Sequence, residues 1–171
     1  MKTVIQTGVR FIFFLLVQVL ILNHVEVGGG SLIMIYPLFV FLLPVEMNIF
    51  LLMTLAFALG ISIDALSDTF GLHASSLVTM AYFRPILLKT FAPRDGYEQI
   101  PESNVHALGF YWFLRVFGIL ILIHHLWFFM LELFKLNDVV FALQKTAISA
   151  PMSFMICLLL QYLFIGKSKD T

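Results

Sequence analysis

The chain has 171 residues, 61% of them hydrophobic and only 12% charged, with a mean hydropathy of +1.00. Soluble domains are about 45–50% apolar and about 25% charged, so this composition excludes a soluble globular domain and favours a bilayer environment. Ten basic and ten acidic residues give a formal net charge of zero, which argues against a nucleic-acid partner. The single Cys157 excludes a disulfide framework or a cysteine-based metal site within one chain.

Long apolar stretches recur along the whole chain. A helix needs about 20 apolar residues to span the hydrocarbon core. In chain order, the stretches that predict helices are residues 4–22, 32–43, 48–66, 72–91, 107–134 and 139–165. The predicted fold is therefore an all-α membrane protein, a polytopic bundle of about six transmembrane helices in which residues 1–171 form one domain.

The first stretch, residues 4–22, has two interpretations. Lys2 and Arg10 precede a short apolar run, as they would in a cleaved signal peptide. No small-residue cleavage site follows, and the rest of the chain is equally apolar. We therefore expect a retained first helix.

The second stretch, residues 32–43, is short for a membrane span. A helix rises about 1.5 Å per residue, and Pro44 ends the run before the core is crossed. We expect a tilted helix, a helix extended through Ser31, or one arm of a re-entrant hairpin. The residues alone leave these alternatives open.

Lysine and arginine residues set the expected orientation, because cytoplasmic loops are enriched in them. With both termini inside, the cytoplasmic side holds Lys2, Arg10, Lys89, Arg94, Lys167 and Lys169, and Arg84 and Arg115 lie nearest to that side. The opposite side holds only Lys135 and Lys145. We therefore predict both termini in the cytoplasm, with one substantial loop, residues 89–106, on the same side.

The end of the third predicted helix carries two acidic residues, Asp64 and Asp68, whose spacing of four places them on one face. Gly60, one turn earlier, lets a neighbouring helix approach that face closely. One interpretation is a polar corner of Asp64, Ser67, Asp68 and His73 that binds a partner or a solute. The other is a pair of interfacial carboxylates that cap a helix–helix turn.

His73, Ser76, Met80 and Arg84 recur at helical spacing along the fourth predicted helix, so this side is expected to face protein rather than lipid. Arg84 lies near the cytoplasmic end of that helix, and we expect it to snorkel to the interface. Arg115 lies deeper in its own helix, unless the length of residues 107–134 brings it nearer the surface.

The last two predicted helices carry further ionisable residues. His124 and His125 are adjacent and point about 100° apart, so they cannot share one site on one helix face. Counted from the loop between the helices, Lys145 falls at about the depth of His125. We predict that Glu132 and Lys145 form an ion pair, with His125 or Gln144 as an optional further partner, which locks these two helices together.

Catalytic and cofactor-binding motifs are missing from the sequence. It contains no H-E-x-x-H, no G-x-S-x-G, no P-loop and no dinucleotide fingerprint. The histidines lack ligand-like spacing and a supporting carboxylate pattern. We therefore expect no enzyme activity, no cofactor and no bound metal.

Residues 60–74 read Gly-Ile-Ser-Ile-Asp-Ala-Leu-Ser-Asp-Thr-Phe-Gly-Leu-His-Ala. This run resembles the signature of MreD, the family of bacterial rod shape-determining membrane proteins. Asp68 stands where that family usually has glycine, and Phe70 stands where leucine is common. Phe83-Arg84-Pro85, the loop that contains Arg94 and Asp95, and the long fifth helix with its paired histidines are also similar to the family.

The resemblance implies a non-enzymatic scaffold of the cell-elongation machinery, which supports peptidoglycan synthesis and rod shape in the bacterial inner membrane. The implied partners are MreC, a single-pass protein with a large periplasmic domain, then RodA and its penicillin-binding transpeptidase, and indirectly MreB filaments. A distant similarity to the substrate-binding components of energy-coupling-factor vitamin transporters is also implied. Asp64 and His73 match motif positions and are expected to be structural or interaction residues.

The candidate partner-binding or structural polar residues are Asp64, Asp68, His73, Arg84, Arg94, Asp95, Arg115, His125, Glu132 and Lys145. The alternative function is a small-solute-binding component of a transporter. The expected topology places Gln18, Asp64, Asp68, His73, His125, Glu132, Gln144 and Lys145 in the outer half, where an externally open pocket would lie. Components of that kind carry an Ala-x-x-x-Ala-like patch on the first helix, and residues 11–22 contain no alanine, which favours the scaffold.

Overall fold

The computed structural model describes residues 2–25, 28–94, 96–97, 103–133 and 139–164. In chain order the elements are α1 (Lys2–Leu20), η1 (Leu22–His24), α2 (Pro37–Leu42), α3 (Ile49–Ser67), α4 (Leu72–Thr90), α5 (Val105–Leu108), α6 (Phe110–Leu133) and α7 (Val139–Phe164). The described residues form helices and no strands. The predicted all-α class is therefore confirmed.

Four helices within the described ranges are long and apolar enough to cross a membrane: Val4–His24, Ile49–Ser67, Phe110–Leu133 and Val139–Phe164. The chain is therefore an all-α membrane protein. α4 has the same length as α3, 19 residues, but it is more polar and falls outside this group. Its polar residues include Arg84 and Lys89.

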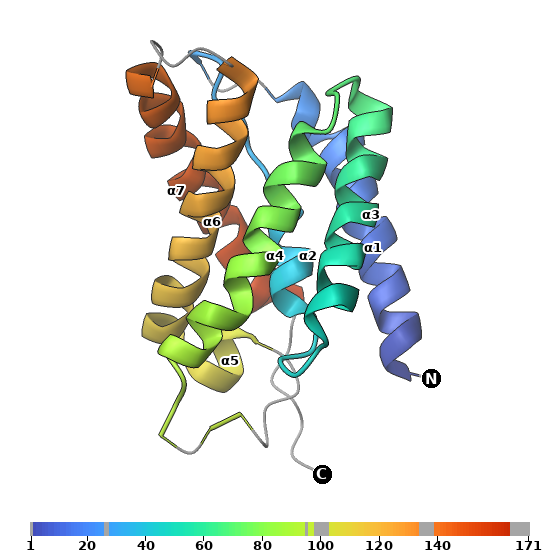
Figure 1. Ribbon diagram of the computed structural model, residues 1–171, viewed down its shortest axis with the longest axis vertical. Coiled ribbons are helices and arrows are strands. Elements are labelled where there is room, and N and C mark those ends of the chain that lie inside the picture. Colours follow the sequence, from blue (N-terminus) through green and yellow to red (C-terminus); the bar gives the residue numbers. More distant parts are fainter. Residues whose placement is uncertain (1, 26–27, 95, 98–102, 134–138, 165–171) are drawn as a thin grey trace.

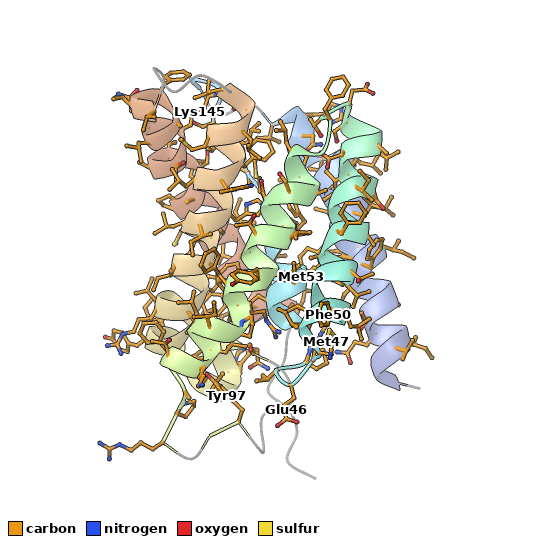
Figure 2. All side chains as sticks on the ribbon, viewed as in Figure 1. Glu46, Met47, Phe50, Met53, Tyr97 and Lys145 are labelled. Carbon is orange, nitrogen blue, oxygen red and sulfur yellow. The ribbon has the colours of Figure 1, made fainter. Side chains whose placement is uncertain are left out.

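The long helices pack side by side in the order α1, α3, α4, α6 and α7. α1 begins at the end of the molecule drawn lowest in Figure 1, here called the lower end, and α7 finishes there too. η1 and the turn between α3 and α4 lie at the opposite, upper end. Figure 2 places Lys145 at the upper end and Glu46 and Tyr97 at the lower end.

The prediction of a helix over residues 32–43 is wrong. Only Pro37–Leu42, six residues, is helical, and residues 31–36 run without helical structure through the middle of the bundle. Residues 31–43 are called the central segment below. All of residues 33–43 are buried. The apolar run therefore reflects burial inside the protein rather than contact with lipid.

Aromatic rings hold both α2 and α7 against α6. The ring of Phe41 lies 4.9 Å from that of Phe117 and 5.5 Å from that of Phe113. Phe154 of α7 packs on the same two rings at 5.5 and 5.9 Å. Each such pair contributes about 0.5–1.5 kcal/mol beyond area burial. This packing fixes α2, because apolar burial alone gives little advantage over contact with lipid.

α3 and α4 cross closely at Gly60, as its position in the sequence predicted. A Cβ atom on Gly60 would collide with the Cα of Ala74 and would lie 2.9 Å from the carbonyl oxygen of His73. Only glycine fits, because the obstacle is backbone that cannot move aside. The crossing holds the end of α3 against the start of α4 at the upper end.

Candidate functional site

Gln18 of α1 pairs with the backbone of the central segment as a neighbouring strand would. Its Nε2 donates to the carbonyl oxygen of Ile33 at 3.0 Å, and its Oε1 accepts from the N–H of Ile35 at 3.0 Å. An unpaired backbone group in hydrocarbon costs several kcal/mol, so non-helical backbone at membrane depth needs such partners. Gln18 thereby ties the central segment to α1.

Two serines on one face of α7 accept hydrogen bonds from the backbone of the central segment, on the side opposite Gln18. Ser149 Oγ accepts from the N–H of Leu32 at 3.0 Å, and Ser153 Oγ accepts from the N–H of Met34 at 2.9 Å. The hydroxyl of Ser153 then donates to His125 Nε2 at 3.1 Å, and the His125 Nδ1–H donates to its own helix at Ile121 O. His125 is therefore a structural residue that locks α6 to α7.

Arg84 of α4 binds the other end of the central segment. Its guanidinium donates to the carbonyl oxygens of Phe41 at 3.2 Å and Pro44 at 3.3 Å, and to that of Leu43. Arg84 is only 1% exposed, so the expectation that it snorkels is wrong. The physical reason is the end of α2, whose last carbonyls lack helical partners and attract a cation.

Asp64 caps the start of α4 from the end of α3. Its carboxylate accepts from the N–H of His73 at 3.0 Å, the N–H of Ala74 at 2.9 Å and the hydroxyl of Thr69 at 2.6 Å. The N-cap residue of α4 is Gly71, which has no side chain to do this. The capping interpretation therefore holds for Asp64.

Asp68 does not share that role, although it lies one turn away. It ends α3 in the left-handed conformation with φ of 53°, and its side chain is exposed. A positive φ suits glycine, and Asp is one of the few other residues that tolerate it. The carboxylate of Asp68 makes no hydrogen bond or ion pair with any residue that the structure describes.

Next to the turn between α3 and α4, the rings of His73, Tyr36 and His124 form a stack. His73 Nδ1 lies 2.8 Å from the hydroxyl of Tyr36, whose ring packs edge-on against His124 at 5.1 Å. Both ring nitrogens of His124 are buried and have no partner among the described residues. His124 and His125 thus serve different neighbours, as their adjacency in the sequence predicted.

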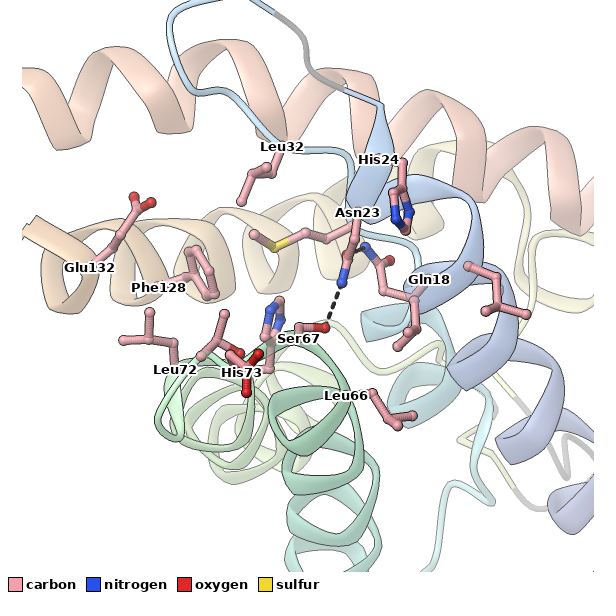
Figure 3. A pocket seen from close by; sticks show the side chains of 15 residues that line it. Gln18, Asn23, His24, Leu32, Leu66, Ser67, Leu72, His73, Phe128 and Glu132 are labelled. Carbon is pink, nitrogen blue, oxygen red and sulfur yellow. Dashed lines mark hydrogen bonds between the residues drawn. The ribbon is translucent and has the colours of Figure 1, made fainter.

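A cavity of about 450 Å³ opens at the upper end, with His73 of this stack in its wall, and Figure 3 shows the side chains that line it. Its polar lining consists of Gln18, Asn23, His24, Ser67, Asp68, Thr69, His73 and Glu132. Its apolar lining consists of Val19, Leu20, Leu32, Met34, Leu66, Leu72 and Phe128. Asn23 Nδ2 donates to Ser67 Oγ at 2.7 Å and so joins η1 to the end of α3 across the cavity wall. This cavity is the first of two candidate sites.

The predicted ion pair between Glu132 and Lys145 is confirmed. Lys145 Nζ lies 2.9 Å from Glu132 Oε2, and the ammonium also lies over the rings of Phe129 and Phe141. Neither optional partner takes part, because His125 binds Ser153 and Gln144 is exposed. The pair ties α6 to α7 and places one carboxylate on the wall of the cavity.

The remaining predicted site residues lie elsewhere. Arg94 and Arg115 are exposed, and neither lines the cavity. Asp95 lies outside the described residues. Among the residues that are described, no group of three or more His, Cys, Asp or Glu side chains is placed to hold a metal ion.

Tyr36, Ser149 and Ser153 belong to the site but are not among the residues predicted from the sequence. The two serines are four residues apart on one helix, which is the spacing of a polar stripe in an apolar span, and this signal was available. Tyr36 stands just before Pro37 within an otherwise apolar run. A tyrosine hydroxyl buried there requires a partner, but only the fold identifies that partner as His73.

A second opening lies at the lower end between α1 and α7. This groove, of about 360 Å³, is lined by Gln6, Val9, Arg10, Phe13, Phe14, Leu38, Leu42, Leu160 and Phe164. Leu38 and Leu42 belong to α2, so the central segment forms part of its wall. Apart from Gln6 and Arg10 the lining is apolar, which suits another apolar helix.

The loop after α4 is fastened near the lower end. Tyr97 Oη donates to the carbonyl oxygen of Leu88 at 2.8 Å, and Trp112 Nε1 donates to that of Phe91 at 2.7 Å. Partial burial raises the pKa of Tyr97, so its hydroxyl stays protonated and able to donate at neutral pH. The start of this loop is therefore held against α4 and α6.

No protein-family model, curated protein or solved structure matches the chain. The resemblance of residues 60–74 to MreD stays a prediction. The geometry around this run gives Gly60, Asp64 and His73 definite roles in one helix hairpin: a close crossing, a cap and a buried hydrogen bond.

Proposed function

We propose that this protein is a non-enzymatic scaffold of the bacterial inner membrane that receives the transmembrane helix of an MreC-like single-pass partner in the groove between α1 and α7. Through that partner it supports RodA and its transpeptidase in cell elongation, with an indirect link to MreB filaments. The resemblance of residues 60–74 supplies the identity of these partners. The groove supplies the place where the first of them binds.

The groove between α1 and α7 is the observation that carries the proposal. α1 is the least buried of the four candidate spans, with 11% of its apolar stretch buried against 33%, 44% and 33% for the others. The side chains of Val9 and Phe13 line the groove on α1, and that of Leu160 lines it on α7. An apolar helix seated there would pack against three elements at once, which is how helix pairs gain stability in a bilayer.

The interior of the bundle supports a scaffold rather than a conduit. The central segment occupies the middle of the bundle and is fixed along its length by Gln18, Ser149, Ser153 and Arg84. A solute that crossed the protein would have to displace this segment and leave its backbone unpaired, at a cost of several kcal/mol per group. A rigid interior with an open flank suits a protein whose task is to hold others.

The proposed topology has about six crossings with both termini in the cytoplasm. α1, the central segment, α3, α4, α6 and α7 run alternately between the two ends of the molecule. Lys89 lies in the last turn of the descending α4 and Arg94 follows that helix, whereas Lys145 lies at the upper end. This distribution supports a cytoplasmic lower end, since cytoplasmic flanks are enriched in Lys and Arg.

Site-specific cross-linking in native membranes tests the proposal. Leu160→Cys places a thiol in the groove, and Phe57→Cys places one on the exposed face of α3 as the matched control. The native Cys157 is buried and will not compete for the reagent. We expect a short thiol cross-linker to join Leu160→Cys, and not Phe57→Cys, to the transmembrane helix of co-expressed MreC carrying its own single cysteine. Equal cross-linking from both positions, or cross-linking from Phe57→Cys alone, contradicts the proposed groove.

A further inference from the structure

We propose that the upper cavity binds a small organic cation: an ammonium group attached to a short apolar body. This inference goes beyond the scaffold function, because the cavity lies at the opposite end of the bundle from the groove. Its volume of about 450 Å³ falls within the range of about 300–1,000 Å³ that is typical of small-molecule sites.

The charge of the lining favours a cation. Two carboxylates, those of Asp68 and Glu132, line the cavity, and no lysine or arginine does so among the described residues. Lys145 pairs with one oxygen of Glu132, and no basic group pairs with Asp68 in the described part of the chain. A cavity walled by apolar side chains and carboxylates concentrates positive charge.

His73 gives the cavity a directed polar group. It is 3% exposed and lines the cavity, and its Nε2 makes no hydrogen bond with any described residue. A consistent chain of donors exists below it. If His73 Nδ1–H donates to Tyr36 Oη at 2.8 Å, the tyrosine hydroxyl is free to point at Met34 Sδ, 3.5 Å away. Nε2 is then an acceptor on a residue that lines the cavity, and an ammonium group can donate to it.

The neighbouring rings complete an ammonium site. The ring of Phe128 lies 4.9 Å from that of His73, and Phe128 also lines the cavity. An ammonium ion is attracted to an aromatic face, and the attraction is stronger where the ion is shielded from water. Met34, Leu32 and Leu72 offer apolar surface for the body of the ligand. Figure 3 shows Glu132 on the opposite side of the cavity from Gln18 and Asn23.

The ammonium group has two sources, a free amine and the headgroup of phosphatidylethanolamine. Leu20 and Leu66 line the cavity and are also 65% and 60% exposed on the outside of the bundle. The cavity therefore adjoins the surface that faces lipid. Both sources present an ammonium group to His73, Asp68 and Glu132. If the site binds the lipid headgroup, phosphatidylethanolamine in the bilayer competes with a soluble amine; if it binds a free amine, the lipid does not compete.

Binding of 2-phenylethylamine to the purified full chain in phosphatidylglycerol nanodiscs tests the site. We expect saturable binding by calorimetry, at least about tenfold weaker binding of the uncharged 2-phenylethanol, and at least about a tenfold rise in Kd for Asp68→Asn. Asparagine tolerates the positive φ at this position, so the variant should keep its fold. Glu46→Gln, which removes a carboxylate at the lower end, is the matched control and should leave Kd unchanged.

Nanodiscs that contain phosphatidylethanolamine then distinguish the two sources. A several-fold rise in the apparent Kd for the amine assigns the site to the lipid headgroup, and an unchanged Kd assigns it to a free amine. The proposal is overturned if 2-phenylethylamine shows no saturable binding in phosphatidylglycerol, if 2-phenylethanol binds equally well, or if Asp68→Asn and Glu132→Gln both keep the Kd of the unmodified chain.

Discussion

The Nη2 atom of Arg84 on α4 lies 3.2 Å from the carbonyl oxygen of Phe41, near the C-terminal end of α2. The same guanidinium reaches the carbonyls of Leu43 and Pro44. Within the described residues no carboxylate lies in ion-pair range of it. A buried arginine is therefore paired with backbone dipoles alone, and it closes a helix that ends inside the protein.

Replacing Arg84 should destabilise the whole bundle. Arg84→Leu removes donors from three backbone carbonyls, and we expect a loss of about 2–4 kcal/mol in the free energy of unfolding, measured as thermal unfolding in detergent. Arg84→Lys should lose less, because an ammonium still reaches some of the carbonyls. The exposed Arg115→Leu is the control and should change little. A stable Arg84→Leu protein that only fails to retain its partner would assign Arg84 to binding instead.

Substitution at Gly60 should be far more damaging than substitution at Gly118. Gly60→Ala drives a methyl group into the backbone of Ala74, and we expect a loss of about 3 kcal/mol or failure to accumulate. The Cβ position at Gly118 meets only Leu114 Cδ1 at 3.9 Å, so Gly118→Ala should be neutral or stabilising by up to about 1 kcal/mol. Yield and melting temperature from matched membrane preparations measure the difference. Similar values for the two variants would mean that α3 and α4 do not cross as described.

Removing the cap of α4 should loosen the turn between α3 and α4. Asp64→Ala deletes the acceptor for two backbone N–H groups and the Thr69 hydroxyl, and we expect a loss of about 2–4 kcal/mol. Asp64→Asn keeps one oxygen and should lose about half as much. Hydrogen exchange at the amides of His73 and Ala74 measures the effect directly. Unchanged protection of both amides in Asp64→Ala would show that another group caps the helix.

Reversing both charges of the Glu132–Lys145 pair should restore the stability that each single charge reversal removes. Glu132→Lys and Lys145→Glu each place like charges together, whereas the double variant restores an opposite pair. The Glu132 side chain is 31% exposed, so we expect a coupling free energy of only about 0.5–1 kcal/mol after screening. A double-mutant cycle of melting free energies measures it. Additive effects of the two substitutions would discard the pairing.

The part of the fold that local pattern controls could be predicted. The long helices and the Glu132–Lys145 pair follow from apolar length and from counting residues on both sides of one loop, which fixes relative depth. Gly60 was identified by the same reasoning, because a small residue beside polar positions marks a close helix crossing. These features depend on residues that are near one another in the sequence.

The central segment could not be predicted, because apolarity does not distinguish a helix in lipid from extended backbone inside protein. Its backbone partners on α7, Ser149 and Ser153, lie 117 and 119 residues away from the groups that they bind. The burial of Arg84 could not be predicted for the same reason. Its acceptors lie 40 to 43 residues away and are backbone carbonyls, which any residue type supplies. No local signal separates such an arginine from one that snorkels.

The central segment also constrains the order of biogenesis. Residues 31–36 emerge from the ribosome early, but the two hydroxyls that accept from the N–H groups of Leu32 and Met34 belong to α7, 117 and 119 residues later. Until α7 is inserted, residues 31–36 must stay at the water interface or in the translocation machinery, because hydrocarbon contains no hydrogen-bond acceptor for their N–H groups. The interior of the bundle can therefore consolidate only once α7 is inserted, and a chain truncated before α7 should be a substrate for membrane proteases.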